Sequence, residues 1–562
     1  MMLVKSPRLL SSITNTSRNV HSLRSRTARI KPSRQSALDR TTLQHLRQAA
    51  TLSTSDAEYG TPVFDHAREL PNGTYSPANY DSKGISATHR LCSWIAGLQM
   101  SDVPSELVTR SKYLLLDGVA CALTCAHIPV SETAARAIFS AEDCVVSAGA
   151  GSCTVIGYPD VKLTPLSAAT LNGTFIQGFE LDDWHKEAPL HSNSIVFPAL
   201  LAAAEHRATK QVSTTGADLL LSMIVGYETG PRVGNALYGR HILSEGWHSG
   251  AVFGPSASAA AVAKLYGLKA DMIEDALGIA CTQASGLMSA QFEADSKRMQ
   301  HGFAARNGLC GAILARDGYS GIKRVYEREY GGFLKQFSQG NGKDPQYKVE
   351  EICKDLGQKW QLEGVCIKPY GTMALTHCTI DCVKALQAEH PELLQKERLN
   401  DIKSIIIRLD EPMFHHGGWK AERPLTAIGG QMSNSFVCAT QLVERENYPA
   451  QYKEEGMEDN TRWDLVHKTT CELRQDYGYG TTEVEITFQS GETIKKLLTA
   501  QRGVSPPLSN EEIVQKWRDL ARRVIDEERM NRVEDFILEL ETKADLNELV
   551  SLLAPTTKNP LA

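Results

Sequence analysis

A chain of 562 residues with a net charge of -6 exceeds one ordinary domain, so we expect two domains plus accessory segments. Its 42 % hydrophobic and 22 % charged residues are typical of a globular protein, and this charge gives no reason to expect nucleic acid or a membrane as partner. No apolar run reaches the roughly eighteen residues of a membrane span. The 13 cysteines, from Cys92 to Cys471, contain no CxxC pair, which favours reduced thiols and an intracellular protein.

The N-terminus has a composition of its own. Its first fifty residues contain ten Lys and Arg side chains but one acid, Asp39, and much of the remainder is Ser and Thr. This composition is typical of a mitochondrial transit peptide, the alternative being a basic tail that binds nucleic acid. We predict a transit peptide over residues 1–55, removed on import into the mitochondrial matrix, and a linker over 56–85.

The next part of the chain is helical in pattern. Apolar residues recur at helical spacing over residues 86–352, and Pro104 is suited to open a helix. Small side chains over 257–263 allow close approach of helix backbones. We predict helices over residues 166–179, 195–207, 217–227, 257–266 and 272–284.

Strand signals gather in residues 353–507. A β-branched run predicts a strand over 402–409, and alternation over 484–488 predicts a hairpin through Gly491 into 493–497. Helices return in 508–556, where Ser509 and Glu512 form a capping box and 546–553 ends the pattern. The expected fold is therefore mostly α, with a smaller α+β domain inserted into a large helical domain built from both chain ends.

Several catalytic signatures are missing. The sequence has no GxxxxGK[ST], HExxH or GxSxG, and Gly149-x-Gly151 lacks the third glycine of a dinucleotide fingerprint. Four polar segments stand out instead within apolar helical sequence, and they contain the candidate site residues.

The first segment is ELDDWHKEAPLHSNS, in which Asp182 and Asp183 precede His185 and His191. A candidate N-cap, Ser192 or Asn193, follows directly and would place His191 at a helix N-terminus, where an anion is favoured. The residues are also of metal-ligand type (Asp183, His185 and His191), but no ligand spacing recurs. A third interpretation is a solvated loop.

Two further segments add histidine and basic side chains. EGWHSGAVFG contains His248, which precedes an Ala-rich helix and faces an anion or is simply packed beside Trp247. SKRMQHGFAARNG contains Lys297, Arg298, His301 and Arg306 between apolar flanks. Such a cluster forms either a solvated face or a buried group that needs an anion.

The fourth segment, IKPYGTMALTH, contains Lys368, Tyr370 and His377. Pro369 keeps Lys368 out of helical geometry, and a new helix begins at about His377. Lys368 is a candidate carboxylate anchor or a lysine whose pKa is lowered for proton transfer.

In order, the stretches ELDDWHKEAPLHS, GYETGPRVGNAL, GWHSGAVFG, ALGIACTQASGLMSAQ, KRMQHGFAARNGL and IKPYGTMALTH resemble the MmgE/PrpD family of lyases. The family includes 2-methylcitrate dehydratases and cis-aconitate decarboxylases, and the first stretch looks closest to the decarboxylases. The resemblance implies a helical domain with an inserted lid, a homodimer, and a site between the domains that uses no metal or cofactor.

Carried over by position, the resemblance places His191, His248, Lys297 and Lys368 in the pocket, with Asp182 and Asp183 at its edge. Lys297 and Lys368 would anchor substrate carboxylates, the two histidines would transfer protons, and Tyr370 and His377 would support them. Three positions depart from the family pattern: Glu180 for Asp, Trp184-His185 for Thr, and Met373 for a His of the animal decarboxylases.

The expected function is cofactor-independent decarboxylation of cis-aconitate, a small tricarboxylate, to itaconate and carbon dioxide. A 2-methylcitrate or alkylcitrate dehydratase and an inactive tricarboxylate-binding member of the family are the alternatives, because the same residue types serve either reaction.

Overall fold

The computed structural model describes residues 84–142, 151–291 and 294–562. The predicted transit peptide and nearly all of the predicted linker therefore lie outside the described residues. Within them the protein is mostly α-helical with small sheets, as the sequence predicted.

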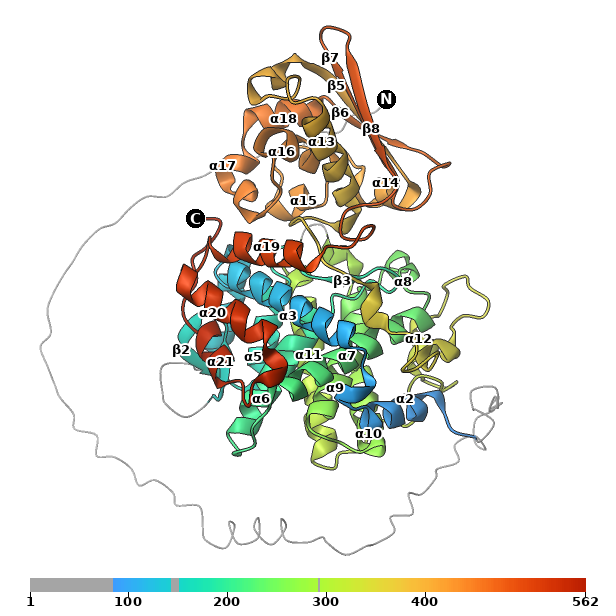
Figure 1. The fold of residues 1–562 in the computed structure, drawn as a ribbon. Coiled ribbons are helices and arrows are strands. Elements are labelled where there is room, and N and C mark those ends of the chain that lie inside the picture. Colours follow the sequence, from blue (N-terminus) through green and yellow to red (C-terminus); the bar gives the residue numbers. More distant parts are fainter. Residues whose placement is uncertain (1–83, 143–150, 292–293) are drawn as a thin grey trace, which may run out of the picture. The chain divides into compact units, whose positions relative to one another are not determined.

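The N-terminal helices pack together (Figure 1), and their buried apolar side chains belong to a large core. They are α2 Ala87–Gly97, α3 Ser105–Cys125, α4 Pro129–Ala141, α5 Pro165–Ile176, α6 Asn193–Ala208, α7 Gly216–Ala236, α8 His241–Ser244, α9 Ser249–Leu265, α10 Ala270–Cys281, α11 Ser296–Arg316 and α12 Phe333–Phe337. Each predicted helix is present. Pro104 is the N-cap of α3, directly before its first residue.

Two helices are longer than predicted. α7 continues through Pro231 and α9 begins before Pro255, although proline is expected to break a helix. Nearly all of both helices is buried, so tertiary packing outweighs the local preference.

The expectation of an unbroken helical region was wrong in detail. Strands β1 Cys153–Val155 and β2 Tyr158–Leu163 pair with each other, and the two-residue β3 Trp184–His185 pairs with β4 Val365–Cys366 far along the chain. Such short strands have too few residues to show alternation in sequence.

The α+β part contains a four-stranded sheet in the order β6-β5-β7-β8. The apolar strand β5 Ile402–Leu409 lies inside it, parallel to β6 Thr469–Leu473 and antiparallel to β7 Thr482–Phe488. The predicted hairpin is confirmed: β8 Thr493–Leu498 pairs with β7, and Gly491 takes a left-handed φ of 91° in the turn. The sequence missed β6. The main helices here are α13 His377–Glu389, α14 Glu411–Gly417, α15 Ala427–Gln431, α16 Asn434–Glu444, α17 Glu454–Met457 and α18 Asn460–His467.

The last helices return to the N-terminal ones. α19 Asn510–Ala521 lies along α3 (Figure 1) and is followed by α20 Glu527–Leu538 and α21 Asn547–Leu553. The buried Lys516 of α19 lies 2.6 Å from Asp117 of α3, and the predicted capping box of Ser509 and Glu512 is present.

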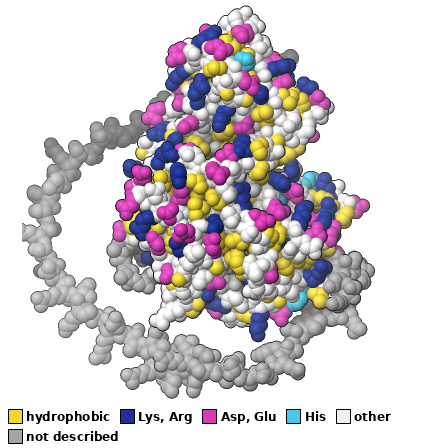
Figure 2. Space-filling view, viewed as in Figure 1, with side chains coloured by type: hydrophobic (Ala, Val, Ile, Leu, Met, Phe, Trp, Pro, Cys, Tyr) yellow, Lys and Arg dark blue, Asp and Glu magenta, His cyan; other side chains and the backbone are white. Residues whose placement is uncertain are grey.

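The surface is polar and mixed in charge. Acidic and basic side chains are interspersed over the face shown in Figure 2. Among the described helices, none alone is long and apolar enough to cross a membrane, although α3 and α4 pass together as a pair bent by 82°.

Candidate active site

A short β-ribbon brings two distant segments of the site together. Trp184 of β3 pairs with Cys366 of β4, and His185 pairs with Val365. The loop before β3 contains the acidic residues of the first polar segment, whereas Lys368 follows β4 by two residues. This pairing places Lys368 beside carboxylates that precede it by more than 180 residues in sequence.

Glu180 is the anion at the centre of the cluster. Its carboxylate contacts Lys297 Nζ, Arg298 Nη1 at 2.7 Å and Lys368 Nζ at 2.8 Å. Burial alone raises the pKa of Glu180, but Lys297, Lys368 and Arg298 hold it well below its usual range. The backbone of Glu180 is left-handed, with φ 54°, a conformation that costs a non-glycine residue about 1–3 kcal/mol. The contacts with three cations offset this strain.

The first turns of α11 present the basic residues of the site. Lys297 and Arg298 are both almost fully buried, and His301 lies on the same face as Lys297, one turn further on. Burial lowers the pKa of Lys297, and Arg298 lowers it further, while Glu180 raises it; the result is about 8. Lys297 is thus a cation that can lose its proton near physiological pH.

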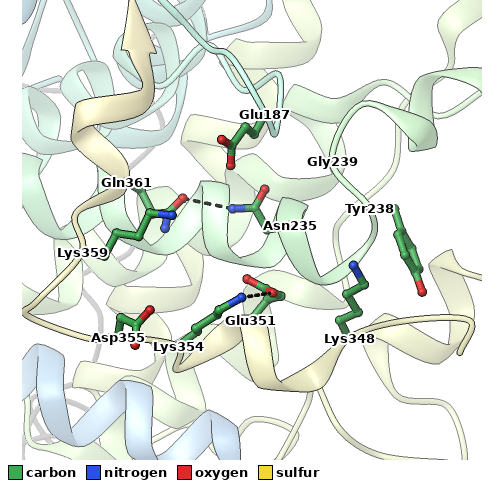
Figure 3. Close-up of a pocket in the computed structure, with 10 residues that line it drawn as sticks. All are labelled: Glu187, Asn235, Tyr238, Gly239, Lys348, Glu351, Lys354, Asp355, Lys359 and Gln361. Carbon is green, nitrogen blue, oxygen red and sulfur yellow. Dashed lines mark hydrogen bonds and ion pairs between the residues drawn. The ribbon is translucent and has the colours of Figure 1, made fainter.

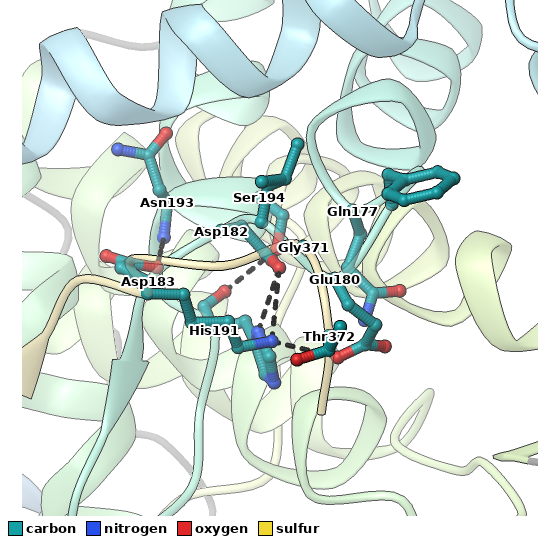
Figure 4. A network of polar contacts seen from close by, with 12 residues as sticks. Gln177, Glu180, Asp182, Asp183, His191, Asn193, Ser194, Gly371 and Thr372 are labelled. Carbon is teal, nitrogen blue, oxygen red and sulfur yellow. Dashed lines mark hydrogen bonds and ion pairs between the residues drawn. The ribbon is translucent and has the colours of Figure 1, made fainter. Parts of the chain in front are cut away.

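Asp182 and His191 form a second polar pair. Asp182 Oδ1 lies 3.1 Å from His191 Nδ1, and the two side chains face each other in Figure 4. Burial would raise the pKa of Asp182, but His191 and Lys368 bring it below its usual value. His191 precedes Ser192, which is the N-cap of α6 and one of the two N-cap candidates in the sequence. It is also the most exposed imidazole of the site, at 16 %.

Three imidazoles lie next to one another. The ring of His301 is 5.1 Å, centroid to centroid, from that of His191 and also 5.1 Å from that of His248, the N-cap residue of α9. Burial, followed by His191, His248 and Lys297, holds the pKa of His301 well below its usual range. Burial and Lys297 lower the pKa of His248 to about 3. His248 and His301 are therefore uncharged at neutral pH.

The cluster has more positive than negative charge. Three cations, Lys297, Arg298 and Lys368, face two ionised carboxylates, Glu180 and Asp182. Buried charges without partners are costly, so this excess favours an anionic ligand. Several buried polar atoms also have no hydrogen-bond partner within the described part of the chain, among them His248 Nδ1, His301 Nε2 and both amide atoms of Gln177.

Asp183 and His185 form their hydrogen bonds with other partners. Asp183 accepts hydrogen bonds from Tyr227 Oη at 2.6 Å and from the backbone N–H of Asn193, and burial raises its pKa to about 7. His185 Nδ1 accepts from the backbone N–H of Ala188. The alternative metal site of Asp183, His185 and His191 thus has its side chains bonded to separate partners. Within the described ranges, one group of three possible ligand residues has its ligand atoms within 4.8 Å of one another, and it lies elsewhere, at His89, Asp271 and Glu274.

The fourth polar segment is divided between two places. Lys368 joins Glu180, and His377, the first residue of α13, bonds the carbonyl of Thr372 at 3.0 Å through Nε2; burial and Lys368 lower the pKa of His377 to about 3. The Tyr370 hydroxyl donates to Asp381 at 2.6 Å, and Tyr370 lines a separate cavity of about 730 Å³. The ring of Tyr370 packs edge-on against that of His377, with centroids 5.3 Å apart, and its hydroxyl is bonded to Asp381.

A smaller cavity lies elsewhere in the helical part (Figure 3). It has a volume of about 320 Å³ and is lined by side chains of both signs, such as Lys354 and Glu351, whose charged groups are 2.9 Å apart. Acid and base neutralise each other there, unlike in the cluster around Glu180.

The structure adds residues that the sequence did not assign. Glu180, Arg298 and His301 stood within the polar segments, but their roles depend on tertiary contacts. Gln431, at the end of α15, had no sequence signal. Its amide N–H groups donate to the carbonyls of Phe179 and Gly371, and its carbonyl accepts from Arg298 at 3.0 Å. Gln431 therefore ties the α+β part to both sides of the cluster.

The fold and this site define the class of the protein. The chain matches the MmgE/PrpD N-terminal domain over residues 89–346 and the MmgE/PrpD C-terminal domain over residues 370–542. The protein belongs to the MmgE/PrpD family, as its ordered motifs predicted.

The chain is also similar to individual proteins with curated names. A cis-aconitate decarboxylase-like protein of Aspergillus oryzae is 46 % identical over 476 residues, 84 % of this chain and 97 % of the relative. The cis-aconitate decarboxylase of Aspergillus terreus is 44 % identical over 482 residues, again 84 % and 97 %. The cis-aconitate decarboxylase of Homo sapiens is 26 % identical over 484 residues, 83 % of this chain and 94 % of the relative.

Proposed function

We propose that this protein is a carboxy-lyase that converts cis-aconitate to itaconate and carbon dioxide. The observation that carries the proposal is the buried excess of positive charge at Lys297, Arg298 and Lys368, which suits a polycarboxylate. Two relatives at 44–46 % identity bear the name of this activity or a name derived from it, which supports the same reaction.

The cations supply what decarboxylation needs. When the bond between the leaving carboxylate and its carbon breaks, the electron pair stays on that carbon and delocalises toward a remaining carboxylate. Fixed positive charges stabilise this developing charge without a cofactor. Lys297 and Lys368 bind the remaining carboxylates. Arg298, which is bonded to both Glu180 and Gln431, adds a third fixed positive charge.

The reaction also consumes one proton, which must reach a buried carbon. His191 is suited to deliver it, because Asp182 lies 3.1 Å away to form an ion pair with the protonated ring and because His191 is partly exposed to solvent. His248, with its pKa lowered to about 3, stays uncharged and is the weaker donor. We therefore assign proton delivery to His191 in preference to His248.

Direct assay tests the function. Pure protein incubated with cis-aconitate should release carbon dioxide and itaconate in equal amounts. Lys368→Met should abolish this turnover, whereas Lys186→Met, which removes an exposed lysine near the same loop, should not. Dehydration of 2-methylcitrate by the wild-type protein, without itaconate formation from cis-aconitate, would establish the dehydratase instead.

We propose further that the protein works without a metal, since the described residues of the cluster are explained by carboxylate binding. Activity should survive exhaustive treatment with EDTA. Loss of activity that one divalent ion restores would overturn this assignment.

We also propose mitochondrial import directed by residues 1–55, supported by their ten basic residues and single acid. A fluorescent fusion should enter mitochondria and its counterpart lacking residues 1–55 should stay in the cytosol.

We propose in addition that the protein forms a homodimer, supported by the family resemblance. Light scattering should give twice the mass of one chain, and a monomeric mass would refute the dimer.

A further inference from the structure

His301 is a buried residue of the cluster without a part in the mechanism so far. It is fully buried on α11, and both neighbouring imidazoles lie within 5.1 Å of its ring. Gly250 leaves the room for it, because a Cβ at that position would overlap His301 Nε2. The backbone of Gly250 therefore lies directly beside Nε2 of His301.

The hydrogen bonds of His301 define its tautomer. Ser194 Oγ donates to the carbonyl of His191 at 3.0 Å and also lies 2.7 Å from His301 Nδ1. A hydroxyl has one proton, so when Ser194 donates it to the carbonyl of His191, the 2.7 Å contact is a hydrogen bond that His301 Nδ1–H donates to Ser194 Oγ. Nε2 is then an uncharged acceptor, with no hydrogen-bond partner in the described ranges.

The site is therefore divided into two ends. Lys297, Arg298 and Lys368 form the cationic end, whereas the uncharged imidazoles of His248 and His301 form the other end, where Asp182 Oδ2 lies 4.0 Å from His301 Nδ1. Lys297 and His301 are four residues apart on one helix face, which separates their Cβ atoms by about 5–6 Å. A six-carbon tricarboxylate is long enough to reach from one end to the other.

We infer that His301 faces the carboxylate that leaves, and that with His248 it presents an uncharged imidazole there in place of a fixed cation, so this carboxylate is stabilised less in the ground state than those held by Lys297 and Lys368. The inference rests on the proposed decarboxylation. The carbon–carboxylate bond breaks, its electron pair delocalises through the neighbouring carbon–carbon double bond, neutral carbon dioxide departs past the uncharged imidazoles, and a proton from His191 forms the new C–H bond at the far carbon of that double bond, which leaves the double bond at the carbon that lost the carboxylate. Loss of charge from the departing group is favoured where the surroundings do not stabilise that charge.

Two substitutions test this role. His301→Lys adds a cation at the uncharged end, so it should bind cis-aconitate more tightly while turning it over more slowly. We expect a lower KM together with a kcat reduced by about a hundredfold, the pattern of a stabilised ground state. His301→Gln is uncharged and can still reach Ser194, so its kcat should fall less than tenfold. Cys310→Lys, which adds the same charge to a half-buried position about 13 Å further along α11, is the control.

Ligand binding separates this role from a structural one. Tricarballylate, an unreactive tricarboxylate, should bind His301→Lys about tenfold more tightly than wild type, whereas itaconate, which lacks the departed carboxylate, should bind both equally. A raised KM or an unchanged kcat in folded His301→Lys overturns the inference. If that variant does not fold, His301→Gln decides: a loss above a hundredfold in the folded protein means that His301 transfers a proton. A wild-type protein that forms no itaconate refutes the proposed function itself.

Discussion

The pH dependence of activity follows from the charge of Lys297. This side chain is almost fully buried, and its pKa falls from 10.5 to about 8. The shift means that the site disfavours the charged form of Lys297, relative to the neutral form, by about 3 kcal/mol more than water does. A lysine loses its positive charge as pH rises through its pKa, so roughly half the molecules retain this cation at pH 8 and roughly a tenth at pH 9. We therefore expect kcat/KM for cis-aconitate to fall about tenfold per unit above pH 8.

Lys297→Arg isolates this effect. Arginine stays protonated over the whole accessible range, so the alkaline decline of kcat/KM should move well above pH 9, even if the peak rate is lower. Glu180→Gln should move the decline below pH 8, because Glu180 raises the pKa of Lys297. Itaconate formation is measured by chromatography between pH 6 and 10, with Lys186→Arg as the surface control. An unchanged decline in folded Lys297→Arg would refute the assignment to Lys297.

Three more outcomes are expected. His191→Gln should lower kcat by about a hundredfold with little change in KM, measured by steady-state kinetics; near-normal kcat would place the donor elsewhere. The pKa of Asp183 is raised to about 7, so its protonated form stabilises the fold at low pH and this contribution is lost as pH rises from about 4 to 7. Asp183→Asn should therefore flatten the decrease in Tm between about pH 4 and 7, and an unaltered slope contradicts the shift. Gln431→Ala should raise KM several-fold and cost about 1–3 kcal/mol of unfolding free energy in denaturant titrations, because it leaves the carbonyls of Phe179 and Gly371 without their donor; an unchanged KM would show that Gln431 does not position the site.

Local patterns predicted much of the secondary structure. Strand β5 was predicted with its observed bounds, and the capping box at Ser509 correctly marked the start of α19, because periodicity and capping are properties of neighbouring residues. α7 runs past Pro231 because burial in the core outweighs a local preference, which the sequence of one helix does not reveal.

In the site, too, local sequence predicted the residue types but not the contacts between distant segments. The residue types of the polar segments predicted that cations and histidines would gather around an anion. They did not predict that Glu180 would supply that anion, because its position depends on the two-residue pairing of β3 with β4 and on a left-handed backbone. Gln431 was not predictable at all, since its three bonds join segments distant in sequence and a lone glutamine has no pattern.

Glu180 also explains how such a site exists in a folded protein without substrate. Burying Lys297, Arg298 and Lys368 together costs several kcal/mol for each charge unless an anion accompanies them. Glu180 contacts all three, so it stabilises the empty site, but it leaves one positive charge unmatched once Asp182 is counted. A polycarboxylate therefore completes the neutralisation and shares cations that Glu180 already holds. Affinity for substrate and stability of the free protein are thus coupled through one carboxylate, and its strained backbone persists because the cations fix it in place.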